Sequence, residues 1–232
     1  MTPACTCPSK WQTMADVPDI PILLLGEPGV GKSTFLSYPP SRLTLGDTHK
    51  PNQPLPSLRD LDQPYPFNIK LYNRPYRFEF SDTASPTHYT LLRPSVLILC
   101  YSIADPASLA ALTTEWKRVV ETHFNYNEDI PVIVLGLKRD VRTKEDYDGR
   151  VRAAAAYPDD DGDDGAMLKG RTVVYPQEAL RIAQEMRCDR YCECSALTGE
   201  LCHEVFEDIA RTAAMTTTTK GGQTEGTSCA IQ

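Results

Sequence analysis

The feature that most constrains the fold of this chain is the segment GEPGVGKS at residues 26–33. It matches the pattern G-x-x-x-x-G-K-[ST] and follows an apolar run at residues 20–25, which is typical of a buried parallel strand. Small residues let backbone N–H groups wrap a row of phosphates, and the start of the following helix adds a favourable dipole. Lys32 is expected to neutralise the β and γ phosphates, and Ser33 to ligate Mg²⁺. We therefore predict a loop that binds the phosphates of a nucleotide. Such a loop does not by itself determine whether the nucleotide carries adenine or guanine.

Apolar runs and helix-like segments alternate along the rest of the chain. The helix after the loop is expected to be short, because Pro39 and Pro40 would break it. The alternation predicts an α/β fold of three layers, α/β/α, with a mostly parallel sheet of about six strands. The expected strands are residues 20–25, 67–71, 76–80, 96–101, 131–136 and 191–194, and the expected helices are 106–124, 177–187 and a closing helix with an apolar stripe at Leu201, Val205, Phe206 and Ile209.

Length and local composition predict one domain with irregular ends. Residues 1–19 are expected to be a disordered extension, 20–215 the domain, and 216–232 a flexible tail. A polar stretch at about 142–171 interrupts the domain, and its acidic segment PDDDGDDG is expected to be a solvated loop. A calcium loop is disfavoured there because the ligand positions fail from Asp160 onward.

Charge and cysteine usage exclude several classes of protein. A net charge of −7 argues against a general nucleic-acid binder, which needs clustered Lys and Arg. The amino terminus has no apolar segment of a secretory signal, and no run approaches the length of a membrane span, so a cytoplasmic protein with reduced thiols is expected. Cys188, Cys192, Cys194 and Cys202 are interpreted as buried small residues, with a zinc site as the less favoured alternative because the spacing is wrong.

Three further segments, each after an expected strand, resemble motifs of the Ras superfamily. Asp82-Thr83-Ala84 resembles D-T-A-G, Leu137-Lys138-Arg139-Asp140 resembles [NT]-K-x-D, and Cys194-Ser195-Ala196-Leu197 resembles C-S-A-[KL]. The segments YCECSALT, YPQEA, DPAS and LRP, together with the polar insert, are similar to the Rho branch. The resemblance covers roughly residues 20–215 and is poor between residues 40 and 75. Because these motifs occur in the family's order along the chain, the sequence resembles that of a divergent Rho-like small GTPase.

The resemblance implies a guanine-nucleotide switch that binds GTP or GDP with Mg²⁺. Asp82 would hold the metal through a water, Asp140 would accept hydrogen bonds from the guanine N1–H and amine, and the Ala196 N–H would meet the guanine O6. An ATP-using kinase is the more distant alternative, against which Asp140 argues. The implied nucleotide-binding residues are Glu27, Pro28, Gly29, Val30, Gly31, Lys32, Ser33, Thr34, Asp82, Lys138, Asp140, Ser195, Ala196 and Leu197, and the implied metal ligands are Ser33, Asp82 and Ser57.

Departures from the family pattern bear on catalysis. Pro86 stands where the family has the glutamine that orients the attacking water, and proline has no side-chain donor or acceptor. Pro28 replaces a loop glycine, and about six residues of the second switch are missing after Pro94. We therefore expect GTP hydrolysis with slow intrinsic turnover. One alternative is that the attacking water is oriented by a partner protein or by another side chain, such as Thr87 or His88. The other alternative is a scaffold protein that does not hydrolyse GTP and stays GTP-bound.

Two more sites are expected outside the nucleotide pocket. For the threonine of the first switch, Ser57 in PSLRD is preferred over Thr48, and a loop without that role is an equal alternative. The chain ends in Cys229-Ala230-Ile231-Gln232, a prenylation box that with Gln last favours farnesyl on Cys229. Partners implied by the resemblance are effectors, an exchange factor and a GTPase-activating protein of Rho type, and a membrane, most simply the cytoplasmic face of the plasma membrane.

Overall fold

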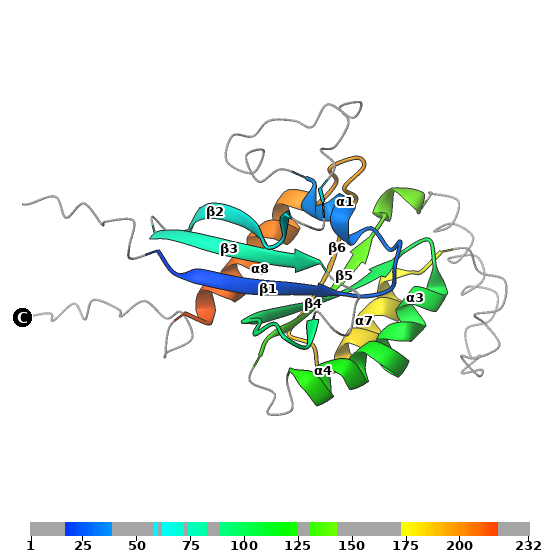
Figure 1. Cartoon of the computed structure of the whole chain (residues 1–232). Helices are drawn as coiled ribbons and strands as arrows, with labels where there is room; N and C mark the ends of the chain where they lie inside the picture. Colours follow the sequence, from blue (N-terminus) through cyan, green and yellow to red (C-terminus); the bar gives the residue numbers. More distant parts are fainter. Residues whose placement is uncertain are drawn as a thin grey trace, which may run out of the picture.

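A computed structural model describes residues 17–38, 58–59, 62–71, 74–82, 89–124, 130–142 and 173–217. Within these ranges, six strands form one sheet in the order β2-β3-β1-β4-β5-β6 (Figure 1). All neighbouring strands are parallel except β2 and β3, which are antiparallel. The strands are β1 (Asp19–Leu25), β2 (Tyr65–Leu71), β3 (Arg74–Asp82), β4 (Val96–Ser102), β5 (Val132–Leu137) and β6 (Arg190–Glu193).

Helices cover both faces of this sheet, which confirms the three-layer expectation (Figure 1). Successive residues of a strand point to opposite faces, so Ile22 and Leu24 of β1 pack towards α1 and α8, while Leu23 and Leu25 pack towards α3 and α7. The helices are α1 (Lys32–Leu36), α3 (Pro106–Ala111), the π-helical turn η4 (Leu112–Trp116), α4 (Lys117–His123), the 3₁₀ turn η5 (Arg139–Val141), α7 (Pro176–Glu185) and α8 (Cys202–Met215).

Local chemistry explains where the helices begin and end. The Asp105 side chain accepts a hydrogen bond from the Ala107 N–H at 3.0 Å, and Pro106 occupies the first turn of α3. Helix α1 is only five residues long, which agrees with the short helix that was predicted.

None of the helices in the described ranges is both long enough and apolar enough to cross a membrane.

The strand predictions are correct in number and order but too short at β2 and β3. Pro66 and Pro75 lie inside these strands, whereas the expectation excluded both prolines. Strand β2 is at the edge of the sheet, and Pro75 is the second residue of β3, positions where a strand tolerates a missing N–H donor.

The apolar stripe of the closing helix is confirmed for Val205, Phe206 and Ile209, which are all buried. Phe206 stacks on Phe35 of α1 with ring centroids 4.4 Å apart, so the two helices on this face share one aromatic contact. The prediction is wrong for Leu201, which precedes α8 in a left-handed conformation and is 39% exposed. The acidic insert and both ends of the chain lie outside the described residues, so their predictions stay predictions.

Candidate functional site

The phosphate half of the site is the loop between β1 and α1. Lys32, only 6% exposed, donates from Nζ to the carbonyl oxygens of Gly26 at 2.9 Å and Glu27 at 3.1 Å. Gly26 has φ +142°, and a Cβ there would lie 2.2 Å from the Cys100 carbonyl oxygen. Only glycine therefore lets the loop turn tightly over β4. The ammonium group is thus held inside a ring of backbone, the geometry expected for binding phosphate groups.

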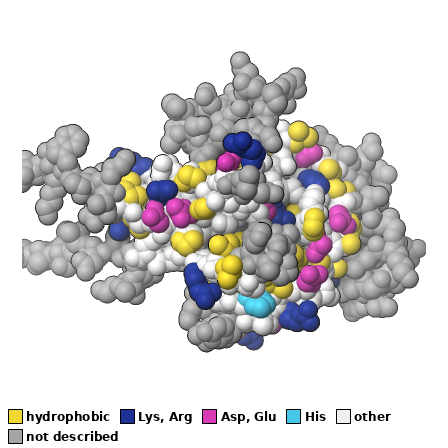
Figure 2. All heavy atoms as spheres, in the orientation of Figure 1, with side chains coloured by type: hydrophobic (Ala, Val, Ile, Leu, Met, Phe, Trp, Pro, Cys, Tyr) yellow, Lys and Arg dark blue, Asp and Glu magenta, His cyan; other side chains and the backbone are white. Residues whose placement is uncertain are grey.

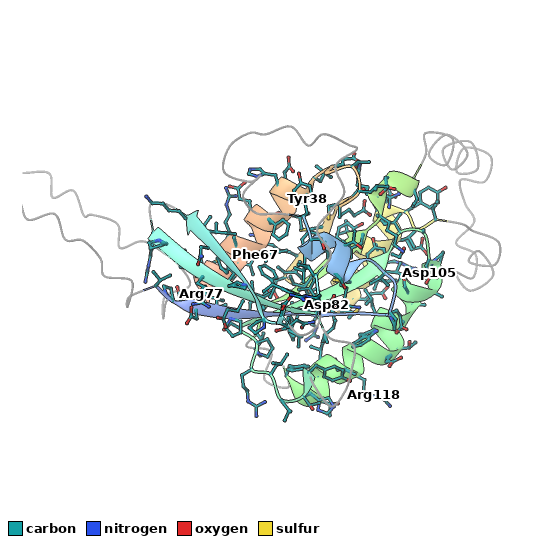
Figure 3. The ribbon with its side chains drawn as sticks, turned by 45° about the horizontal axis from the view of Figure 1, so that its top comes forward. Tyr38, Phe67, Arg77, Asp82, Asp105 and Arg118 are labelled. Carbon is teal, nitrogen blue, oxygen red and sulfur yellow. The ribbon has the colours of Figure 1, made fainter. Side chains whose placement is uncertain are left out.

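A hydroxyl and a carboxylate meet beside this loop. Strands β1 and β3 are parallel neighbours, so their carboxyl ends lie at the same edge of the sheet. The Ser33 Oγ donates to Asp82 Oδ2 at 2.5 Å, and Lys32 Nζ lies 3.8 Å from Asp82 Oδ1. Asp82, labelled in Figure 3, is the last residue of β3. Hydroxyl and carboxylate oxygens are the ligands that Mg²⁺ prefers, so the donor set fits this ion. Gln63, which sequence reasoning missed, holds the backbone of Asp82 through two hydrogen bonds of 2.9 Å, to its N–H and its carbonyl.

The residues predicted to read the base, which we call the base half of the site, follow β5 and β6. Lys138 adopts a left-handed conformation (φ 63°) directly after β5, and its Nζ donates to the Gly29 carbonyl at 2.7 Å. Asp140 accepts a short hydrogen bond from the Ser195 hydroxyl, which also accepts from the Thr198 N–H at 3.2 Å. The Lys138–Gly29 contact joins the segment after β5 to the phosphate-binding loop. The predicted base-reading residues and the predicted phosphate-binding residues therefore lie at one edge of the sheet.

A hollow of about 400 Å³ opens beside these residues, lined by Arg139, Asp140, Arg142, Thr198 and Glu200. Ala196 is 7% exposed, whereas Leu197 is 63% exposed. Leu137, where the family pattern has Asn or Thr, is buried, and a Cβ on Gly31 would lie 3.7 Å from its side chain. Leu137 shares a buried apolar cluster with Val30 of the phosphate-binding loop, and its side chain offers no hydrogen-bonding atom at this position.

The comparisons with known proteins agree with this geometry. The Ras family model matches residues 21–215. The chain belongs to the Ras family.

Similar proteins place this Ras-family protein in the Rho branch as a divergent member. Rho-related GTP-binding protein RhoD from Homo sapiens is 25% identical over 203 residues, covering 85% of this chain and 84% of the relative. GTP-binding protein rho2 from Schizosaccharomyces pombe is 25% identical over 216 residues, covering 90% and 94%. Rho-related GTP-binding protein RhoF from Mus musculus is 26% identical over 201 residues, covering 84% and 82%.

The predicted nucleotide-binding residues of this Ras-family protein differ in their surroundings. Pro28 and Gly29 are exposed in the loop and Ser33 and Thr34 are exposed in the first turn of α1, while Val30 is buried in the core. The side chain of Glu27 accepts a hydrogen bond from Trp116 Nε1 at 3.0 Å, and so binds the π-helical turn η4. Sequence reasoning missed Trp116, whose N–H fixes a carboxylate 89 residues away. Turns of π helix recur near functional sites, and this one presents Trp116 to the phosphate-binding loop.

Several predicted positions lie outside the described residues. These are Pro86 with its alternatives Thr87 and His88, the first-switch candidates Ser57 and Thr48, and the lipidation site Cys229. Their roles remain predictions.

A buried polar network lies behind the base half of the site and was also missed. Arg142 donates to the two carboxylate oxygens of Glu193 at 2.6 and 2.9 Å, and to the Val174 carbonyl at 2.7 and 3.1 Å. Burial alone would raise the pKa of Glu193, but hydrogen bonds from Arg142 and Tyr191 lower it below its ordinary value. Glu193 is therefore a carboxylate held ionised in the interior.

Cys192, Cys194 and Cys202 are buried, as interpreted from the sequence, whereas Cys188 is half-buried. Burial raises the pKa of Cys192 to about 11, with a further contribution from Asp208. The same desolvation raises the pKa of Cys188 to about 12. These thiols are structural rather than reactive groups at neutral pH.

Proposed function

We propose that this Rho-like protein of the Ras family is a molecular switch that binds GDP or GTP with Mg²⁺. The observation that carries the proposal is the hydrogen bond from Lys138 to the Gly29 carbonyl, because it joins the segment that we propose to read a purine to the loop that we propose to bind phosphates. A ligand spanning both must carry a base at one end and phosphates at the other. Proteins named Rho-related GTP-binding protein among the relatives support the same assignment.

Each half of the pocket has a defined task in this proposal. The Lys32 ammonium and the loop amides stabilise the phosphates, while Ser33 and Asp82 hold Mg²⁺, which would neutralise the charge between the β and γ phosphates. Asp140 accepts hydrogen bonds from the guanine N1–H and exocyclic amine, a donor pair that adenine lacks. Ser195 orients the Asp140 carboxylate, and the Ala196 N–H meets the guanine O6.

Nucleotide recognition is tested by exchanging the carboxylate that reads the base. Asp140→Asn presents an amide to the base, so GDP should bind at least about tenfold more weakly, while xanthosine diphosphate, which offers an acceptor at position 2, should gain affinity. Asp62→Asn is the matched control, since Asp62 is an exposed carboxylate paired with Arg59. Calorimetry on protein stripped of nucleotide measures both affinities. No heat with GDP or GTP for the unaltered protein would refute the proposal.

We further propose that GTP is hydrolysed to GDP and phosphate with slow intrinsic turnover. Pro86 offers no side-chain hydrogen-bond donor or acceptor to orient water. The carboxylate of Glu27 in the phosphate-binding loop is engaged by Trp116. Single-turnover hydrolysis measures the rate, and Pro86→Gln should raise it. A rate for the unaltered protein equal to that of a typical Ras-type enzyme would contradict slow turnover, and no phosphate release at all would favour the GTP-bound scaffold.

The switch would act through effectors, an exchange factor and a GTPase-activating protein of Rho type, with Ser57 as the first-switch metal ligand. Prenylation of Cys229 would bring the protein to the cytoplasmic face of a membrane; one isoprenoid holds a membrane marginally, so the association would be reversible. Cys229→Ser should shift the protein from the membrane fraction to the supernatant. An unchanged partition would count against lipidation.

A further inference from the structure

Four side chains converge on the carboxylate of Glu193 at the end of β6. Arg142 donates at 2.6 and 2.9 Å, Arg139 Nε lies 3.7 Å away, Tyr101 donates at 3.4 Å, and Tyr191 makes a short hydrogen bond. The side chains of Arg142 and Glu193 are 1% and 8% exposed. We call these five residues the Glu193 cluster.

The centre of the cluster is buried and tightly packed, whereas Arg139 at its edge keeps 28% of its side chain exposed. Burial is the largest of the causes that raise the pKa of Tyr101 and the pKa of Tyr191, so both hydroxyls remain protonated donors at neutral pH. A Cβ on Gly136 would lie 2.6 Å from the Tyr101 hydroxyl and 3.1 Å from Glu193 Cγ. The glycine inside the apolar strand β5 is therefore required by the cluster, since any other residue would displace the tyrosine.

The two arginines of the cluster flank the residue proposed to read the base. Arg139 immediately precedes Asp140, and Arg142 follows it by two residues, so Glu193 holds the turn η5 from both sides. Arg139 N–H also donates to the Cys194 carbonyl at 3.2 Å, and its side chain pairs with Glu200. The turn is thus bound to the segment that carries Ser195.

This arrangement compensates for the apolar residue at the end of β5. Leu137 has no polar atom in its side chain to bond the neighbouring loops, yet Lys138 and Asp140 must keep one orientation to face a planar base. Charge-assisted hydrogen bonds between buried groups are directional and strong, and they constrain the turn in a way that apolar packing does not.

We propose that Glu193 is a positioning residue for guanine recognition, which fixes Asp140 through Arg139 and Arg142 and is itself held by Tyr101 and Tyr191. The inference rests on the proposed binding of guanine nucleotides. The ligand group concerned is the N1–H and 2-amino edge of guanine, and inosine diphosphate, which lacks the amine, isolates that edge.

The test compares equilibrium affinities for GDP and inosine diphosphate, measured by calorimetry with excess Mg²⁺ on protein stripped of nucleotide. One hydrogen bond from the amine to a carboxylate should make GDP bind about 10- to 100-fold more tightly than inosine diphosphate to the unaltered protein. Glu193→Gln keeps the shape of the side chain and removes its charge. It should lower that ratio at least about threefold, because a displaced Asp140 loses the amine contact.

Two further variants make the result decisive. Tyr191→Phe removes only one hydroxyl from the cluster and should lower the ratio in the same direction, so it decides the matter if Glu193→Gln fails to fold. Glu185→Gln on α7 is the control, since this carboxylate is exposed and pairs with Arg181 four residues away.

The possible results separate this inference from the proposed function. A lower ratio in the cluster variants and an unchanged ratio in the control support the positioning role. Equal losses of affinity for both nucleotides, with the ratio unchanged, would mean that Glu193 is merely structural and would overturn the inference alone. Absence of GDP binding by the unaltered protein would overturn the proposed function and the inference together.

Discussion

Replacing Arg142 by Met is expected to destabilise the protein strongly and to change how its stability depends on pH. The Glu193 carboxylate would stay buried but lose its two closest donors, and the Val174 carbonyl would lose two more hydrogen bonds. Removing one partner of a buried ion pair costs about 3–5 kcal/mol. Arg139 and the tyrosine hydroxyls still face Glu193, which favours the lower end of this range. We therefore expect the free energy of unfolding to fall by about 3–4 kcal/mol at pH 7.

The direction of the pH dependence follows from the pKa of Glu193. In the unaltered protein this pKa is lowered, so the stability that the ionised group contributes is present above the unfolded value of 4.5 and lost as the pH falls below it. Without Arg142, we expect burial, the largest single cause, to outweigh Tyr191 and Arg139 and to raise the folded pKa of Glu193 above its ordinary value. Protonation then favours the folded state, and the variant should regain stability as the pH falls from 7 to 5.

Urea unfolding without added nucleotide, at pH 7 and pH 5, measures both effects, since bound ligand would add its own stabilisation. Arg211→Met is the matched control, because Arg211 pairs with Glu207 at the surface with both side chains about 40% exposed, and it should cost at most about 1 kcal/mol. A deficit for Arg142→Met below about 1 kcal/mol at pH 7, or one that grows towards pH 5, would refute the reasoning.

Three other changes probe separate parts of the molecule. Gly26 has φ +142°, and Gly26→Ala would place a methyl group 2.2 Å from the Cys100 carbonyl oxygen. We therefore expect little folded protein, which thermal unfolding would show as the loss of a cooperative transition. A normal transition would contradict the close approach. Phe206→Ala removes the ring stacked on Phe35 and should lower the free energy of unfolding by about 3–5 kcal/mol in urea titrations, whereas the exposed Met215→Ala should cost well under 1 kcal/mol. With a pKa of about 11, Cys192 should react with iodoacetamide at pH 8 about a hundredfold more slowly in the folded than in the urea-unfolded protein, as followed by peptide mass spectrometry; equal rates would argue against burial of the thiol.

Much of the architecture and of the phosphate half could be predicted because these features are local. The strand, loop and helix around Lys32 occupy consecutive residues, and each apolar run is long enough to identify a strand. Parallel strands end at one edge, so Asp82, Asp140 and Ser195 could be expected to approach the loop before any distance was known.

The groups that support the site could not be predicted, because they join distant parts of the chain. Gln63 binds the backbone of Asp82 19 residues away, Trp116 binds Glu27 across 89 residues, and Arg142 binds Glu193 across 51. A single arginine or glutamine has no periodicity or spacing to mark it. The one local signal was Gly136, a glycine inside an otherwise apolar strand, which indicates close approach by another group but does not name it.

The bonds from Arg142 to the carbonyl of Val174 have a practical consequence for engineering. They hold together two points of the chain separated by 32 residues, and the Val174 N–H is bonded in turn to the Ile103 carbonyl at 2.8 Å. Closing a flexible loop costs only about 0.6 kcal/mol more for each doubling of its length. A designed flexible linker, peptide tag or small reporter domain joined between Arg142 and Val174 would therefore have both of its ends held by these bonds, and we expect the neighbouring pocket to keep its shape.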